Sequence, residues 1–187
     1  VYQKFSTNQM VGVLRLLKTI VGREPKRSGY GIRDTWNQTR DLLPFENGIL
    51  RLSDRVLLSH APEFMFNWTL PYQYEPAATC PVIKMVIENI SGKDLSTQQT
   101  LLAFLAAVML GMPDVQKYLE IIGKPGTGKS TFLKIAKDLV GDVNTVTTSM
   151  RQLHENRFET ANFYGKRLAI IPDADQWGGS VEVLKNI

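Results

Sequence analysis

The chain has 187 residues and a net charge of +4, and 43% of its residues are hydrophobic and 21% charged, which is ordinary for a soluble globular protein. Its single cysteine, Cys80, excludes an internal disulfide. The longest apolar run, residues 101–110, is too short to cross a bilayer, and no signal peptide is visible, so we expect a cytoplasmic protein with no membrane partner.

The positive charge is concentrated at the start of the chain. Residues 1–41 hold 8 basic and 3 acidic side chains. A basic segment of this kind can attract the phosphate backbone of a nucleic acid, although a solvated helix face and loop explain the same charges equally well. Because the first residue is not Met and residues 183–187 read as the middle of an element, we expect a fragment of a longer protein.

The first elements are a helix and a hairpin. Apolar residues at helical spacing predict a helix over residues 10–21, and a polar loop with Gly and Pro follows at 23–31. Asn47-Gly48 predicts a type I′ turn between strands at 42–45 and 49–52. A third short strand is expected after Asp54-Arg55.

Two helices are expected next, after a proline-rich, loop-like region at 61–81. Pro81 suits the first turn of a helix whose apolar residues between 82 and 90 share one face. Ser96 and Gln99 match a capping box for a second, apolar helix that ends at Gly111.

The pattern after Pro113 changes to strands that alternate with helices. Such alternation favours a parallel sheet with right-handed crossovers, and so an α/β fold. Strands are expected at 118–122, 143–148 and 168–171, and helices at 131–140 and 150–155.

Residues 123–130 read Gly-Lys-Pro-Gly-Thr-Gly-Lys-Ser and fit the Walker A pattern G-x-x-x-x-G-K-[ST] at every fixed position. Glycines let the backbone N–H groups face inward, and the following helix N-terminus adds partial positive charge. The motif predicts an ATP site in which Lys129 reaches the β- and γ-phosphates and the Ser130 hydroxyl binds Mg²⁺. The predicted nucleotide-binding residues are Gly123, Gly126, Thr127, Gly128, Lys129, Ser130 and Thr131.

A P-loop enzyme also needs an acidic side chain at the end of a neighbouring buried strand. Asp173 and Asp175 follow the strand expected at 168–171. Asp173 is the better candidate for the Mg²⁺ shell, and either carboxylate could orient the attacking water. Lys129, Asp173 and Asp175 are therefore the predicted catalytic residues, although strands that end in an acidic turn are also common elsewhere.

Together these residues resemble superfamily 3 helicases of the viral, phage and plasmid primase–helicase type. The resemblance covers roughly residues 42–187. Besides the P-loop and the 168–175 segment, it rests on Phe45-Glu46-Asn47-Gly48-Ile49-Leu50, His60-Ala61-Pro62-Glu63-Phe64, Leu70-Pro71-Tyr72-Gln73-Tyr74, Cys80-Pro81 and Gly165-Lys166-Arg167-Leu168-Ala169.

The resemblance implies an AAA+-like P-loop ATPase domain at 112–187, incomplete at the C-terminus, and a small hairpin-plus-helical domain at 42–111. The charges and the helical spacing add a partial basic helical segment at 1–41. It implies a homo-oligomeric ring, usually a hexamer, that couples ATP hydrolysis to movement on single-stranded DNA during replication, often with an attached primase. Pro172 stands where the family has the first of two adjacent acids. The family's sensor asparagine and arginine finger would follow Ile187, so weak hydrolysis by this chain alone is expected.

Two other functions fit a P-loop. A nucleotide kinase usually has this loop near its N-terminus and an Arg-bearing lid after it, whereas here 122 residues precede Gly123 and no lid is visible. An assembly domain, in which nucleotide stabilises a ring without turnover, is the third alternative.

Overall fold

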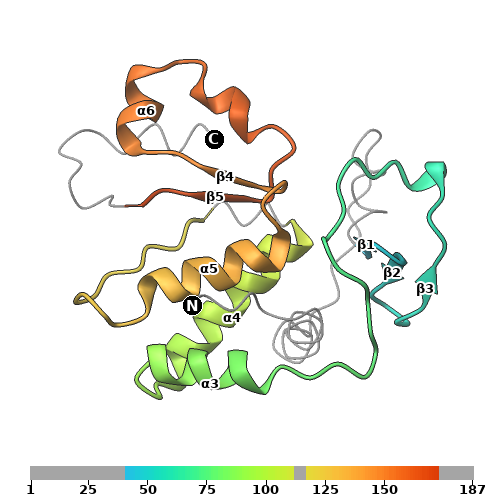
Figure 1. Cartoon of the computed structure of the whole chain (residues 1–187), viewed down its shortest axis with the longest axis horizontal. Coiled ribbons are helices and arrows are strands. Elements are labelled where there is room, and N and C mark those ends of the chain that lie inside the picture. Colours follow the sequence, from blue (N-terminus) through green and yellow to red (C-terminus); the bar gives the residue numbers. More distant parts are fainter. Residues whose placement is uncertain (1–40, 112–116, 173–187) are drawn as a thin grey trace.

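The computed structural model describes residues 41–111 and 117–172 (Figure 1). The helix expected at 10–21 and the polar loop at 23–31 lie outside the described residues. None of the helices in the described ranges is long and apolar enough to span a membrane.

The first described unit is a three-stranded antiparallel sheet in the order β1-β2-β3. Strand β1 (Leu42–Phe45) pairs with β2 (Gly48–Arg51), and β2 pairs with β3 (Leu57–Leu58). Residues 70–72 then run beside β1, because Leu70 N donates to Pro44 O at 2.9 Å and Glu46 N donates to Tyr72 O at 3.1 Å. The predicted hairpin and third strand are confirmed.

The turn of this hairpin differs from the prediction. Its two central residues are Glu46 and Asn47, since Phe45 pairs with Gly48, and neither of them has a positive φ as a type I′ turn requires. The Asn47 side chain instead bonds the backbone of Tyr74, with Nδ2 donating to its carbonyl at 3.0 Å and Oδ1 accepting from its N–H at 2.8 Å. Gly48 is needed because a Cβ there would lie 2.5 Å from Leu58 O.

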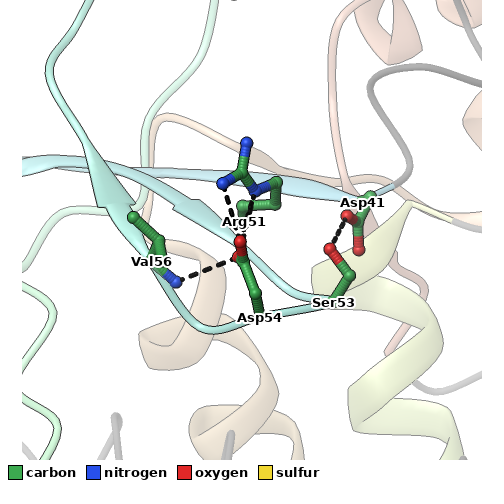
Figure 2. Close-up of polar contacts among 5 residues, drawn as sticks. All are labelled: Asp41, Arg51, Ser53, Asp54 and Val56. Carbon is green, nitrogen blue, oxygen red and sulfur yellow. Dashed lines mark hydrogen bonds and ion pairs between the residues drawn. The ribbon is translucent and has the colours of Figure 1, made fainter.

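The connection between β2 and β3 is closed by exposed charged groups (Figure 2). The Arg51 guanidinium donates to both Asp54 oxygens, at 2.6 Å in the shortest contact, and Val56 N donates to Asp54 Oδ1 at 3.2 Å. Hydrogen bonding by Arg51 holds the pKa of Asp54 below its ordinary value. The Ser53 hydroxyl donates to Asp41 at 2.5 Å, which joins the turn to the start of β1. These contacts hold the turn between β2 and β3 at the surface of the protein.

Two helices follow η1 (Pro62–Phe64) and an irregular segment. Helix α3 (Pro81–Ile90) starts at Pro81, as predicted, and buries Ile83 and Ile87. Helix α4 (Leu95–Leu110) ends at Gly111 in the left-handed conformation, also as predicted, but its cap is Asp94 and not Ser96. The Asp94 side chain accepts from Thr97 N at 2.7 Å, so the helix begins two residues earlier than a cap at Ser96 would place it.

The described residues 117–172 hold a parallel pair of strands and three helical segments. Strands β4 (Thr145–Thr147) and β5 (Leu168–Ile170) pair in parallel, with Thr145 opposite Leu168. They are joined through α6 (Met150–Glu155) and η3 (Glu159–Phe163). Helix α5 (Lys129–Val140) lies between this pair of strands and helices α3 and α4 (Figure 1).

The strand expected at 118–122 is absent from the structure. Leu119 and Ile121 pack against the core while Tyr118 and Ile122 are 69% and 86% exposed, so the side chains alternate as they would in a strand. No strand of the described residues pairs with this segment, and the ladder that defines a strand is therefore missing. The P-loop sheet of the predicted fold class stays a prediction.

One cluster of buried side chains joins β1, β2, α3, α4, α5 and β5. It runs without a break across residue 111, the boundary expected between two domains. Helix α5 contributes a whole face to it at helical spacing, which explains why residues 129–140 form a stable helix. Burial of each large side chain on this face, which excludes the alanine, stabilises the fold by about 1.5–3 kcal/mol relative to exposure. The residues on this face are Phe132, Ile135, Ala136 and Leu139, all 0% exposed.

Candidate phosphate-binding loop

The loop that carries the Walker A pattern leads directly into helix α5. Its last residue, Gly128, is the residue before the helix and has φ 92° and ψ 8°, and Gly126 has φ 78°. Both glycines are in the left-handed region, which side chains with a Cβ rarely adopt. Phe132 N then donates to Gly128 O at 3.0 Å. The helix therefore begins at Lys129, two residues before the predicted start.

Lys129 folds back over the loop that precedes it. Its Nζ atom donates to Gly123 O at 2.5 Å and to Lys124 O at 2.9 Å, and the Thr127 hydroxyl donates to Lys124 O at 2.8 Å. These bonds close the loop into a compact turn with an ammonium group across it. Carbonyl oxygens hold the ammonium there, and phosphate oxygens are stronger acceptors that could take their place.

The start of α5 favours an anion. No side chain caps the helix and no acidic residue lies in its first turn. The first N–H groups of a helix have no partner within it, and they carry partial positive charge. An anion placed there would meet these donors and the Lys129 ammonium together.

The predicted loop residues lie together at the start of α5, whereas the two predicted acidic residues lie outside the described part of the chain. Ser130 and Thr131 lie in the first turn of α5 and are exposed to solvent, beside the glycines of the loop. Asp173 and Asp175 lie outside the described residues; the strand expected to precede them is β5, which ends at Ile170. Over the described part of the chain, no group of three His, Cys, Asp or Glu side chains could hold a metal ion.

No sequence pattern predicts the contacts that hold the C-terminal end of α5. The Tyr72 hydroxyl donates to Leu139 O at 2.8 Å, and burial raises the pKa of this phenol, so it stays neutral. The Asn144 side chain donates to Thr69 O at 2.9 Å and to Val140 O at 2.7 Å. These bonds join residues 69–72 to the C-terminal end of the helix.

A further contact joins the same segment to the start of β5. The Arg167 guanidinium lies over the Trp68 ring, 3.7 Å from its centroid, and is packed against Gly111. Burial lowers the pKa of Arg167 to about 10, so the group is still charged at neutral pH. An arginine over an indole face is an attractive cation–π contact. The contact holds the start of β5, the strand that precedes Asp173 in the sequence, against Trp68.

Two family models match separate parts of this chain. Residues 7–92 match a family described as "D5 N terminal like", and residues 121–187 match one described as "Family of unknown function (DUF5906)". Domains of the first kind occur in primase–helicase proteins, and the two matches together suggest the phage and plasmid primase–helicase family and a role in replication.

One similar protein comes from a liverwort. The "Uncharacterized mitochondrial protein ymf21" of Marchantia polymorpha is 24% identical over 126 residues, which is 61% of this chain and 70% of that protein. Its name states no activity.

Proposed function

We propose that this chain is the ATP-binding part of a superfamily 3 DNA helicase, of the primase–helicase type, and that residues 123–130 are its phosphate-binding loop. The observation that carries the proposal is the position of the Lys129 ammonium across a glycine loop at an uncapped helix start. Two family matches support it, one that precedes the loop and one that includes it.

The proposed fold is an α/β P-loop sheet of the AAA+ type. Two features support it: β4 and β5 are parallel, and α5 packs against β5. The proposed assembly is a homohexameric ring on single-stranded DNA, and the proposed cofactors are ATP and Mg²⁺.

The chemistry proposed for the site uses the described groups as follows. Lys129 leaves the carbonyl oxygens of Gly123 and Lys124 and donates to phosphate oxygens, while backbone N–H groups at the start of α5 donate to the same triphosphate. The exposed Ser130 hydroxyl would hold Mg²⁺ together with Asp173, and the metal would neutralise charge that develops on the phosphates.

The direct test is ATP–Mg²⁺ binding by calorimetry, with Lys129→Ala against wild type. A charge-assisted hydrogen bond contributes about 1.5–3 kcal/mol, so Lys129→Ala should weaken binding about tenfold or more. Lys124→Ala is the matched control, because this lysine lies in the same loop and contributes only its carbonyl to the contacts described. Wild-type protein that binds no ATP, or equal binding by Lys129→Ala, would overturn the proposal.

A second measurement separates the motor from the other P-loop functions. ATP hydrolysis that single-stranded DNA stimulates, measured in the full-length protein, is the expected result. Phosphoryl transfer to a small acceptor would show a kinase instead. Nucleotide-dependent assembly without turnover would show that the site serves only to build an oligomer.

A further inference from the structure

Residues that precede the loop in the sequence contact both ends of helix α5. Pro71 and Tyr72 contact its C-terminal end, and the aliphatic side chain of Ile90 contacts its N-terminal end. Ile90, the last residue of α3, lies against Gly128. A Cβ added to Gly128 would be 2.7 Å from Ile90 Cγ1 and 3.1 Å from Cδ1. The Gly128 backbone therefore rests directly on this side chain, with no room for a larger residue.

Ile90 is itself held firmly in place. It is half-buried and packs against the core, and the turn that follows it is fixed by hydrogen bonds. The Ser91 hydroxyl donates to Glu88 O at 2.9 Å, and Lys93 N donates to the same oxygen at 3.0 Å. Asp94 then caps α4. A side chain anchored in this way can resist movement of the loop.

Gly128 needs such support because its conformation sets the direction of the donors. Gly128 is in the left-handed region, directly before the helix. Its φ and ψ angles therefore determine the direction of the N–H groups in the first turn of α5. The loop's own bonds, from Lys129 and Thr127, are exposed to solvent and end on the carbonyl oxygens of Gly123 and Lys124. At Gly128 itself, the side chain that lies against the backbone is Ile90.

We propose that Ile90 is a positioning residue for the phosphate loop, which keeps Gly128 in the left-handed conformation that aims the α5 N–H groups at a triphosphate. The expected effect on ATP affinity rests on the function proposed above. The support that Ile90 gives to Gly128 does not depend on that function. Since coupling between two sites is reciprocal, nucleotide binding should also stabilise the end of α3.

The test compares Ile90→Ala with Val86→Ala by amide hydrogen exchange in nucleotide-free protein. Val86 is the matched control because it is on the same helix, half-buried and packed on the same core. Ile90→Ala should speed exchange at residues 126–131 at least fivefold, whereas Val86→Ala should leave these amides within twofold of wild type. Equal exchange at the loop in both variants would overturn the proposal.

ATP affinity provides the second measurement on the same proteins. Ile90→Ala should bind ATP–Mg²⁺ at least fivefold more weakly, and Ile90→Val, which keeps a γ-carbon at the contact, should restore binding to within twofold. If wild type binds no ATP, the proposed function fails while the exchange result still decides whether Ile90 supports the loop. Should Ile90→Ala not fold, wild type provides the reciprocal test: ATP–Mg²⁺ should slow amide exchange at residues 87–91 at least twofold, and unchanged exchange there in protein that binds ATP would contradict the proposal.

Discussion

Helix α5 begins and ends at glycines that have almost the same φ, 92° at Gly128 and 90° at Gly141. At each glycine a Cβ would lie 2.7 Å from a side chain of the preceding region, Ile90 at one end and Pro71 at the other. The difference lies in what surrounds them. Buried polar groups bond the C-terminal end, while the N-terminal end has an apolar contact and donors exposed to solvent.

This difference indicates a division of tasks within one helix. At the C-terminal end, Tyr72 and Asn144 bond carbonyl groups that the helix cannot satisfy itself, so that end is fixed. At the N-terminal end, the Lys129 ammonium donates to the carbonyl oxygens of Gly123 and Lys124, and phosphate oxygens of a ligand could replace these acceptors. Changes at the C-terminal end should therefore lower stability alone, and changes at Gly128 or Ile90 should alter binding as well.

The largest stability effect is expected for Gly141→Ala. With ψ at 157°, Gly141 is in a region that only glycine adopts readily, and the new Cβ would also meet the Pro71 ring. The free energy of unfolding, measured in urea, should fall by about 3 kcal/mol. ATP affinity of the folded protein should stay within twofold of wild type.

Gly92→Ala is the control for backbone strain alone. Gly92 has φ 61°, and nothing lies within 4 Å of an added Cβ. It should lose only about 1 kcal/mol. Equal losses in the two variants would show that neither the Pro71 contact nor the ψ of Gly141 adds to the cost of a positive φ, and weaker ATP binding by Gly141→Ala would contradict the division between the two ends.

Tyr72→Phe should have a smaller effect at the same end. The variant keeps the buried ring but leaves Leu139 O without the hydroxyl donor, which should cost about 1–2 kcal/mol in the free energy of unfolding. Tyr164→Phe, at a tyrosine that is 88% exposed, serves as the control and should change stability little. A loss as small as that of the control would mean that water satisfies the carbonyl equally well.

The smallest effect concerns the cap of α4, which contrasts with the uncapped start of α5. Hydrogen bonds from the Thr97 hydroxyl, and then from its N–H, hold the pKa of Asp94 below its ordinary value. The folded state therefore favours the carboxylate, whose contribution is complete above the ordinary pKa and is lost as pH falls through the lowered one.

Thermal unfolding between pH 7 and strongly acidic pH tests this expectation with Asp94→Asn, which keeps a capping oxygen but cannot titrate. Wild type should lose slightly more stability than the variant as the pH falls. Parallel pH profiles would show that the Asp94 charge does not stabilise the cap.

Local signals predicted much of the fold. Pro81, Gly111 and Gly141 mark helix ends in the sequence as they do in the structure, because proline and glycine act through their own backbone. The cap of α4 was assigned wrongly because Asp94 and Ser96 are both good caps two residues apart. The loop pattern also identified Lys129 as a residue of interest, and in the structure its Nζ contacts Gly123 O and Lys124 O within six residues, while its contact with phosphate stays a prediction.

Contacts distant in sequence could not be predicted. The partner of Asn47 is Tyr74, 27 residues away, and that contact changed the turn type. The segment at 118–122 has the side-chain alternation of a strand, but a strand also needs a neighbour that its own residues do not specify. Ile90 reads as an ordinary face residue of α3, and its contact with Gly128 appears only in three dimensions.

The Asn47 contact determines which positions of this region are free to vary. Both of its hydrogen bonds go to the main chain of residue 74, so neither depends on which side chain stands there. The Tyr74 ring, 5.4 Å from that of Phe45, contributes bulk that other large apolar residues could provide. A short amide is the side chain that offers both a donor and an acceptor at this reach, so position 47 should accept far fewer replacements than position 74.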